Sequence, residues 1–320
     1  MVLLPVLSTD ISLRKFQFSY LNITAADSSA ALAATSASYQ IGYLESIGLA
    51  TNWISPPSIC QHILEYVHVY TGMPWWQTII CVAIGLKIAM FPLIVKSSDT
   101  TMRMARIQPE THRLTQELQE SGGPSNTEAV QKYLEGRNKV MADNGINMKW
   151  MMAPMANIPI SLGMFFGIDA MCLHHVADLT TEGLYWFNDL SVADPYLGLQ
   201  LITSSFYLLM ARFGGETGIQ SSGLMKKVGY ALPVVSVFVT MNFPAAVVLY
   251  FASTGFLSAI QSGLLRSAKF RSFLRIAPLL PAKSIESAQS SASISSQAKI
   301  VIDTVKKVME EQKKQSNLKK

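Results

Sequence analysis

The sequence predicts an all-helical membrane protein with about five transmembrane helices, and three observations lead to this prediction. Only 15% of the 320 residues are charged, against about 25% in an average soluble domain. The charges are clustered, so that residues 153–168, 195–211 and 228–265 contain none, and residues 73–95 contain only Lys87. A single helix crosses the hydrocarbon core with about 20 apolar residues, so these stretches are suited to membrane spans.

Two segments precede the expected spans. Residues 1–55 are rich in Ala and Ser and poor in acids, as in a mitochondrial transit peptide, but they carry few arginines. A leader without a targeting role therefore fits them equally well. Residues 56–72 place Ile59, Ile63 and Val67 at helical spacing between polar positions. This pattern predicts an amphipathic helix that lies along the membrane surface.

Five spans are expected, at residues 75–95, 150–173, 195–211, 228–242 and 244–265. The last two share one apolar stretch that Pro244 interrupts, since proline cannot continue a helix without losing a hydrogen bond. Trp75 and Trp76 are expected at the outer membrane interface and Trp150 at the inner one. Basic residues gather in the loops 96–148 and 212–227 and in the tail, which predicts an inner C-terminus and an outer N-terminus.

The loop at residues 96–148 is expected to form a water-exposed antiparallel helical hairpin. Gly122, Gly123 and Pro124 are a strong turn signal, and Ser125 with Glu128 matches a capping box. The apolar residues on both sides follow a heptad-like spacing, which indicates a short coiled coil: Ile107, Leu114, Leu118, Val130, Leu134 and Met141. A plain solvated loop is the alternative.

Lys87 lies in the middle of the first expected span. A lysine there costs about 2.5–3.5 kcal/mol, and charges within spans usually mark function. The nearer membrane edge is about eight residues away, about 12 Å, which is beyond the reach of a lysine side chain. Lys87 therefore lines a hydrophilic groove, pairs with Asp169 of the second span, or thins the bilayer locally. Other polar residues in the spans are candidates for the same groove: Asn157, Ser161, Thr203, Ser236, Thr240 and Gln261.

Catalysis and metal binding are not expected from this sequence. It contains no nucleophile motif, no HExxH pattern and no phosphate-binding loop. Cys60, Cys81 and Cys172 form no CxxC pair, and the five histidines include no helical ligand pair. We therefore expect a protein that is not an enzyme and that needs no cofactor.

Residues 266–320 are expected to be a basic tail on the inner side. A stretch rich in Ser and Ala at residues 284–296 indicates a linker. Beyond it, Ile300, Val301, Val305 and Val308 fall on one helical face. Seven lysines accompany this face: Lys299, Lys306, Lys307, Lys313, Lys314, Lys319 and Lys320. Such a helix suits an RNA partner, although a tail that obeys only the positive-inside rule is also possible.

Several motifs, in order, resemble the YidC/Oxa/Alb insertase family. Residues 74–94, with Pro74-Trp75-Trp76, Lys87 and Phe91-Pro92-Leu93-Ile94, resemble its first core span. Residues 186–195 and 243–261 are similar to the segments before the third span and within the last one. Residues 214–222 resemble mitochondrial Oxa members in particular. The resemblance covers about residues 45–282.

This resemblance implies a five-span core in the mitochondrial inner membrane that encloses a groove open to the matrix. Lys87 stands where the family typically has arginine, which keeps the charge but loses the bidentate fork. Gly255 and Phe251 also depart from the usual residues, so the roles of those positions are not carried over. The implied partners are lipids, nascent membrane-protein clients such as mitochondrially encoded respiratory-chain subunits, and the mitochondrial ribosome, bound through the tail.

Three other functions compete with co-translational insertion. A post-translational paralogue devoted to cytochrome-oxidase assembly typically lacks a long basic tail such as residues 266–320. A small-solute channel or transporter often shows internal repeats, and none is visible here. A membrane-embedded enzyme would need a catalytic set that this sequence does not display.

Overall fold

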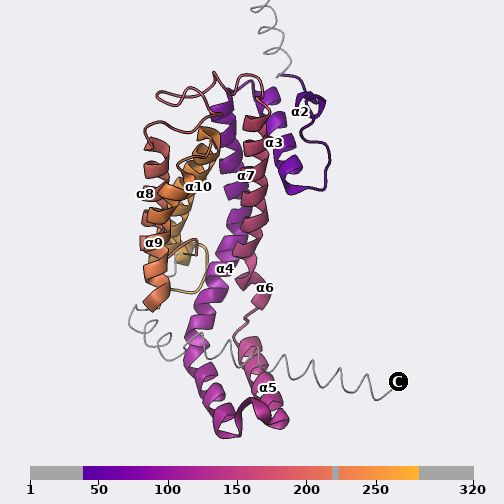
Figure 1. Ribbon diagram of the computed structural model, residues 1–320. Coiled ribbons are helices and arrows are strands. Elements are labelled where there is room, and N and C mark those ends of the chain that lie inside the picture. Colours follow the sequence, from indigo (N-terminus) through magenta and orange to yellow (C-terminus); the bar gives the residue numbers. More distant parts are fainter. Residues whose placement is uncertain (1–38, 218–222, 281–320) are drawn as a thin grey trace, which may run out of the picture. The chain divides into compact units, whose positions relative to one another are not determined.

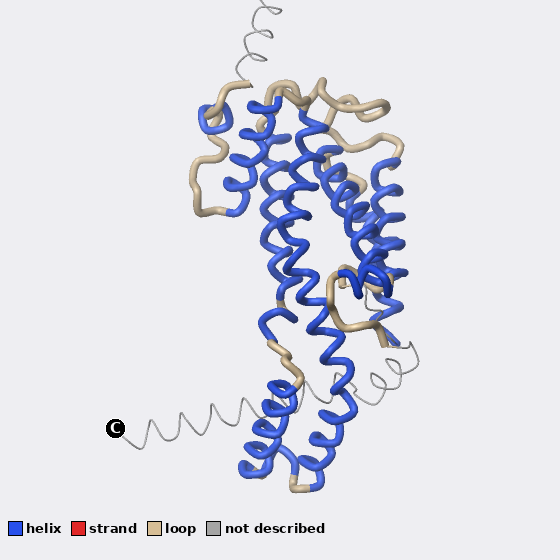
Figure 2. The backbone as a smooth tube through the Cα atoms, turned by 180° about the vertical axis from the view of Figure 1, so that it is seen from behind, coloured by secondary structure: helices blue, strands red, loops and turns tan. Residues whose placement is uncertain are grey.

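The computed structural model describes residues 39–217 and 223–280. Every regular element in these two ranges is a helix, which confirms the predicted fold class there (Figure 2). The chain divides into two compact units, which we describe separately. Among the described residues, unit 1 comprises residues 39–82, Ile160–Pro195 and Asn242–Leu249, and unit 2 comprises Ala83–Pro159 and residues 196–217, 223–241 and 250–280.

In unit 1, α2 (Tyr43–Ser46) is followed by α3 (Pro56–Thr71), the helix expected at residues 56–72. The side chain of Ser55 caps α3 by accepting a hydrogen bond from the backbone N–H of Ser58. The buried residues of α3 are mostly polar: Ser58, Cys60, Gln61, His62, Leu64, Glu65 and His68. On the opposite face, Ile59, Ile63 and Val67 are half-buried and Tyr70 is 76% exposed. This inverted pattern fits a helix that lies between protein and lipid.

The start of α3 packs closely against α7 (Asn157–Leu173) because that face of α7 carries glycines. A Cβ atom on Gly163 would lie 2.9 Å from the carbonyl oxygen of Pro56. The side-chain amide of Gln61 donates to the carbonyl oxygen of Gly167 over 3.0 Å. Larger residues at these two positions would push α3 away.

The helix α4 (Trp75–Glu120) joins the first expected span and the first part of the expected hairpin. It is 46 residues long in total, with Pro92 and Pro109 inside it. The end of the membrane span at residue 95 stays a prediction. The change from apolar to charged side chains does not interrupt a helical backbone. An internal proline removes one backbone hydrogen bond but does not end this helix.

The second half of α4 and α5 (Thr127–Asp143) pack side by side within unit 2 (Figure 1). Ile107, Met141 and Ile146 form their buried contact. The predicted capping box is wrong by one residue. Ser125 belongs to the 3-10 turn η1 (Gly123–Ser125), and the side chain of Asn126 caps α5 by accepting from the backbone N–H groups of Glu128 and Ala129.

The second expected span is interrupted near its start. After α6 (Met148–Met151), the chain forms the 3-10 turn η2 (Ala153–Ala156) and then α7. Pro154 lies in η2, where it disfavours a helical conformation of the preceding residue. The candidate span in the structure, Ala153–Leu173, lies within the expected span at residues 150–173, and its α-helix begins at Asn157.

Trp75 does not face a membrane interface, contrary to the prediction. It is 1% exposed, its indole N–H donates to the carbonyl oxygen of Ala177 over 3.1 Å, and its ring stacks on His68. An aromatic residue beside a predicted span can equally belong to a protein core, and here the loop after α7 covers it.

The remaining helices are α8 (Gly198–Phe213), α9 (Gly223–Thr240), α10 (Ala245–Arg266) and α11 (Ala268–Phe273). The break that Pro244 predicted falls between α9 and α10. The third expected span, residues 195–211, begins later than predicted because Leu197 adopts a left-handed conformation and precedes α8. In unit 2, the hydroxyl of Ser204 donates to the carbonyl oxygen of Pro233 over 2.7 Å and so ties α8 to α9.

Three helical segments are long and apolar enough to cross a membrane within the described ranges: Trp75–Glu120, Ala153–Leu173 and Ala245–Arg266. The third and fourth expected spans correspond to α8, with 16 residues, and α9, with 18 residues. The arrangement of five spans therefore stays a prediction.

Candidate functional site

Lys87 of α4 forms an ion pair with Glu216, which lies in the connection after α8. Its ammonium Nζ is 2.8 Å from Oε1 of Glu216, and the two side chains are 12% and 22% exposed. Lys87 and Glu216 both belong to unit 2. The sequence left three alternatives open for Lys87: a groove, a pair with Asp169, and local thinning of the bilayer. The carboxylate that pairs with Lys87 in the structure is that of Glu216, not that of Asp169.

Two of the polar residues singled out in the sequence gather at the same place. The side-chain amide of Asn157 donates to Oε1 of Glu216 over 3.5 Å. The side-chain amide of Gln261, which is 7% exposed, donates to the backbone carbonyl of Glu216 over 3.2 Å. Residues from α4, α7 and α10 thus converge on one acidic residue.

The backbone on both sides of Glu216 is also held. The hydroxyl of Ser98 donates to the carbonyl oxygen of Thr217 over 2.7 Å, and the hydroxyl of Ser262 donates to the carbonyl oxygen of Gly215. Gly214 and Gly215 have φ angles of 101° and 71°, a region that glycine adopts without strain. The two glycines allow the chain to turn back from α8 and bring Glu216 to Lys87.

The other expected groove residues do not join this cluster. Thr203, Ser236 and Thr240 donate to carbonyl oxygens of their own helices, those of Leu199, Pro233 and Ser236. This is the usual behaviour of hydroxyl groups within spans. Ser161 lies in α7 within unit 1 and is half-buried. The seven tail lysines lie outside the described residues.

Glu216 was missed as a site residue, although the sequence contains a signal for it. It is the only acidic residue between Asp194 and Glu286, a region that carries three predicted spans and several basic residues. An isolated acid in a glycine-rich loop beside a membrane has few ways to be stabilised other than a basic partner. Lys87 is the basic residue that the span itself provides.

The segment after α10 is anchored on α4 by a buried arginine. Arg271 is 1% exposed and donates to Ser98 and to the carbonyl oxygens of Leu265 and Ala277. Burial lowers the pKa of this guanidinium; Asp99 opposes the shift and Arg106 adds to it. Ser98 is therefore shared between Arg271 and the loop that carries Glu216.

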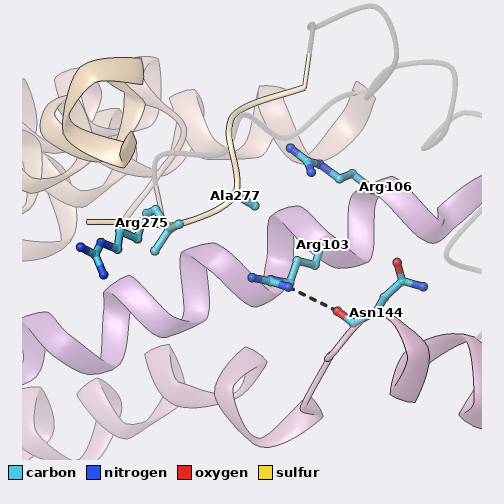
Figure 3. Close-up of a pocket in the computed structure, with 6 residues that line it drawn as sticks. Arg103, Arg106, Asn144, Arg275 and Ala277 are labelled. Atoms are coloured by element: carbon cyan, nitrogen blue, oxygen red, sulfur yellow. Dashed lines mark hydrogen bonds between the residues drawn. The ribbon is translucent and has the colours of Figure 1, made fainter. Parts of the chain in front are cut away.

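Next to this anchor, three arginines line a pocket of about 280 Å³ (Figure 3). Arg103 and Arg106 come from α4, and Arg275 follows α11, while Asn144, Ile276 and Ala277 complete the wall. Asp99 balances part of the charge, since its Oδ2 accepts from Nε of Arg103 over 2.9 Å. The pocket keeps an excess of positive charge and suits an anionic partner.

Metal chemistry has no evident place in the described part of the chain, where no group of three or more His, Cys, Asp or Glu residues could hold an ion. The chemistry that the Lys87 cluster offers is the exchange of one carboxylate for another beside a single ammonium group.

The sequence of this chain is similar to those of known proteins. The 60Kd inner membrane protein family model matches residues 66–271. The mitochondrial inner membrane protein OXA1 of Monosporozyma servazzii is 46% identical over 244 residues, which cover 76% of this chain and 65% of that protein. OXA1 of Saccharomyces cerevisiae is 46% identical over 242 residues, covering 75% and 59%. Mouse OXA1L is 29% identical over 225 residues, covering 69% and 52%. The chain therefore spans about three fifths of the length of its two yeast relatives.

Proposed function

We propose that this chain, which belongs to the 60Kd inner membrane protein family, inserts nascent membrane proteins into the mitochondrial inner membrane. The observation that carries the proposal is Lys87, an ammonium group within the apolar part of α4 whose side chain is only 12% exposed. It is held in a polar cluster and so provides a charged, hydrogen-bonding site part-way across the hydrocarbon.

The mechanism follows from the cost of moving polar groups through lipid. An unpaired polar group costs about 4–8 kcal/mol in hydrocarbon, and a carboxylate costs far more. A site that offers Lys87, Asn157 and Gln261 shortens the apolar path for a client's acidic segment. The client's apolar segment then leaves along the lipid-facing side of the first two spans. The protein changes the path of transfer and makes or breaks no covalent bond.

We assign the five spans of the sequence analysis to α4, α7, α8, α9 and α10. The N-terminus then lies in the intermembrane space, and the hairpin of α4 and α5 lies in the matrix with the C-terminal tail. The three arginines at the base of the hairpin support this orientation, since basic residues gather on the inner side of a membrane. The hairpin receives the client, and lipids surround the core.

We further propose that insertion is co-translational and that the lysines of residues 299–320 contact ribosomal RNA. Dense phosphate charge gives a lysine-rich helix an affinity that falls with salt. The arginine pocket adds positive charge where the tail begins. The clients then include mitochondrially encoded respiratory-chain subunits, whose synthesis takes place on these ribosomes.

The carrying observation is tested by replacing Lys87 in full chains and measuring insertion in vesicles. The client is a membrane segment with an acidic outer tail. Lys87→Met is expected to lower its insertion at least about tenfold, because an unpaired carboxylate then meets hydrocarbon, while Lys87→Arg retains most of it. Lys139→Met, at an exposed position of α5, is the matched control. Equal insertion by the Lys87→Met chain and the original chain would refute the proposed site.

The ribosome contact is tested separately by co-sedimentation with mitochondrial ribosomes across a salt series. The full chain is compared with a truncation after Ala282. Binding that weakens with salt and disappears in the truncation supports the co-translational mechanism. If neither chain binds, the co-translational mechanism is refuted and a post-translational paralogue or a transporter is favoured; equal binding by both chains would refute the contact through the tail.

A further inference from the structure

We propose that Glu216 is a built-in competitor for the client's carboxylate, so that it decides which clients gain access to Lys87. This inference rests on the proposed function and deepens it. In the structure, the carboxylate of Glu216 occupies the position beside Nζ of Lys87 that a client's acid would need. The resting site is therefore already filled by an acid of the same chain, and a client enters by exchange.

The placement of Glu216 does not depend on the ion pair alone. Ser98, Gln261 and Ser262 donate to three successive backbone carbonyls, those of Thr217, Glu216 and Gly215. The three donors are buried, with 0%, 7% and 0% exposure. These contacts hold the backbone wherever the carboxylate points. The side chain can therefore leave Lys87 while the loop stays in place, which is what a displaceable competitor requires.

The groups that contact Glu216 are also those that a client's carboxylate would contact. Oε1 of Glu216 accepts from both Lys87 and Asn157, two donors that a client Asp or Glu would use in the same way. One ammonium group cannot balance two carboxylates in a poorly hydrated site, since like charges at short distance repel strongly. Glu216 and a client acid therefore exclude each other. A neutral polar client cannot drive this exchange, because it offers no charge to Lys87.

A purely structural ion pair makes a different prediction. If Glu216 only neutralised Lys87 for the sake of folding, its loss would weaken the protein and lower the insertion of every client. A competitor predicts the opposite for one class: removing its charge favours acidic clients and leaves neutral clients unchanged. The two interpretations therefore predict opposite changes in the insertion of acidic clients when Glu216 is replaced.

The test uses full chains in vesicles and two clients that share one membrane segment. One client carries Asp residues in its outer tail, and the other carries Asn at the same positions. Glu216→Gln is expected to raise insertion of the Asp client about two- to fivefold, the range of one partly exposed ion pair, with no change for the Asn client. Glu110→Gln, at an exposed position of α4, is the control and should change neither.

A second measurement follows the chemical reactivity of the Lys87 amine. The Glu216→Gln chain should react faster than the original chain with a water-soluble amine reagent at Lys87, as measured by mass spectrometry. Glu216→Asp keeps the charge but shortens the side chain, so it should shift both readouts in the same direction and serves if the Gln variant does not fold.

Unchanged or lowered insertion of the Asp client by both Glu216 variants would overturn the inference. An equal rise for both clients would overturn it as well, because the effect would then not depend on the client's charge. Failure of the proposed function is a separate result, in which the original chain inserts neither client.

Discussion

Two acids of the molecule, the buried Glu65 in unit 1 and the half-buried Glu216 in unit 2, are stabilised in different ways. Glu65 is 2% exposed, and its Oε1 accepts from the backbone N–H of Leu44 over 2.8 Å. Glu216 instead faces the ammonium group of Lys87 and the amide of Asn157. A backbone N–H cannot move away without unfolding the chain locally, whereas a side-chain cation can exchange its partner. The first arrangement is structural, and the second is suited to binding.

Two other polar side chains of unit 1 also accept hydrogen bonds from backbone N–H groups. Oε1 of Gln61 accepts from the backbone N–H of Ala50, and Oε2 of Glu182 accepts from the backbone N–H of Trp75, each over 2.8 Å. Glu182 also accepts from the hydroxyl of Tyr39, and burial together with Glu182 raises the pKa of Tyr39 to about 12. In unit 1, polar side chains supply the hydrogen-bond acceptors for backbone N–H groups around α3.

The largest expected difference between the two acids is in stability. Glu65→Leu should lower the free energy of unfolding by about 2 kcal/mol, because it leaves the buried N–H of Leu44 without an acceptor. Glu216→Leu should lower it by less than about 1 kcal/mol, since a partly exposed ion pair contributes little to stability. Denaturant titration in detergent micelles measures both values. Glu65→Gln keeps an acceptor oxygen and is the control.

A smaller effect should appear as coupling between Lys87 and Glu216. In a double-mutant cycle with Lys87→Met and Glu216→Leu, we expect a coupling energy of about 1 kcal/mol, because each single change leaves one charge without its partner. The same cycle with Lys139→Met in place of Lys87→Met should give a coupling near zero. A coupling near zero for the Lys87 pair itself would contradict the ion pair as a contributor to stability.

The features that the sequence predicted well depend on residues close together in the chain. Pro244 marked the break between α9 and α10, and the isolation of Lys87 in an apolar stretch marked it as a residue that needs polar partners. The features it missed depend on alternatives of similar energy or on distant contacts. Both serine and asparagine side chains can cap a helix, so the sequence alone did not distinguish Ser125 from Asn126, which caps α5. Glu216 pairs with Lys87 across 129 positions, a contact that no local pattern contains.

The smallest expected effect is a pH dependence of stability that originates in unit 1. His68 is 0% exposed and stacks between Tyr39 and Trp75, and its Nδ1 is 2.8 Å from the carbonyl oxygen of Met73. Burial lowers the pKa of His68 below its usual value. The Met73 carbonyl and the acids Glu182, Asp178 and Glu65 oppose this shift without cancelling it.

The unfolded chain therefore binds a proton at His68 at a higher pH than the folded chain does. Stability from the neutral ring is fully present above about pH 6.5, the ordinary pKa of histidine. It is lost as the pH falls from there through the lowered folded pKa, by at most about 1.4 kcal/mol per pH unit for one proton. Unfolding titrations between pH 7.5 and pH 5 measure this slope. His68→Phe keeps the ring stacking and should remove the contribution of His68, whereas His174→Phe, at an exposed position, should leave it. An identical slope in the original chain and the His68→Phe chain would show that the buried polar face of α3 does not sense pH through this ring.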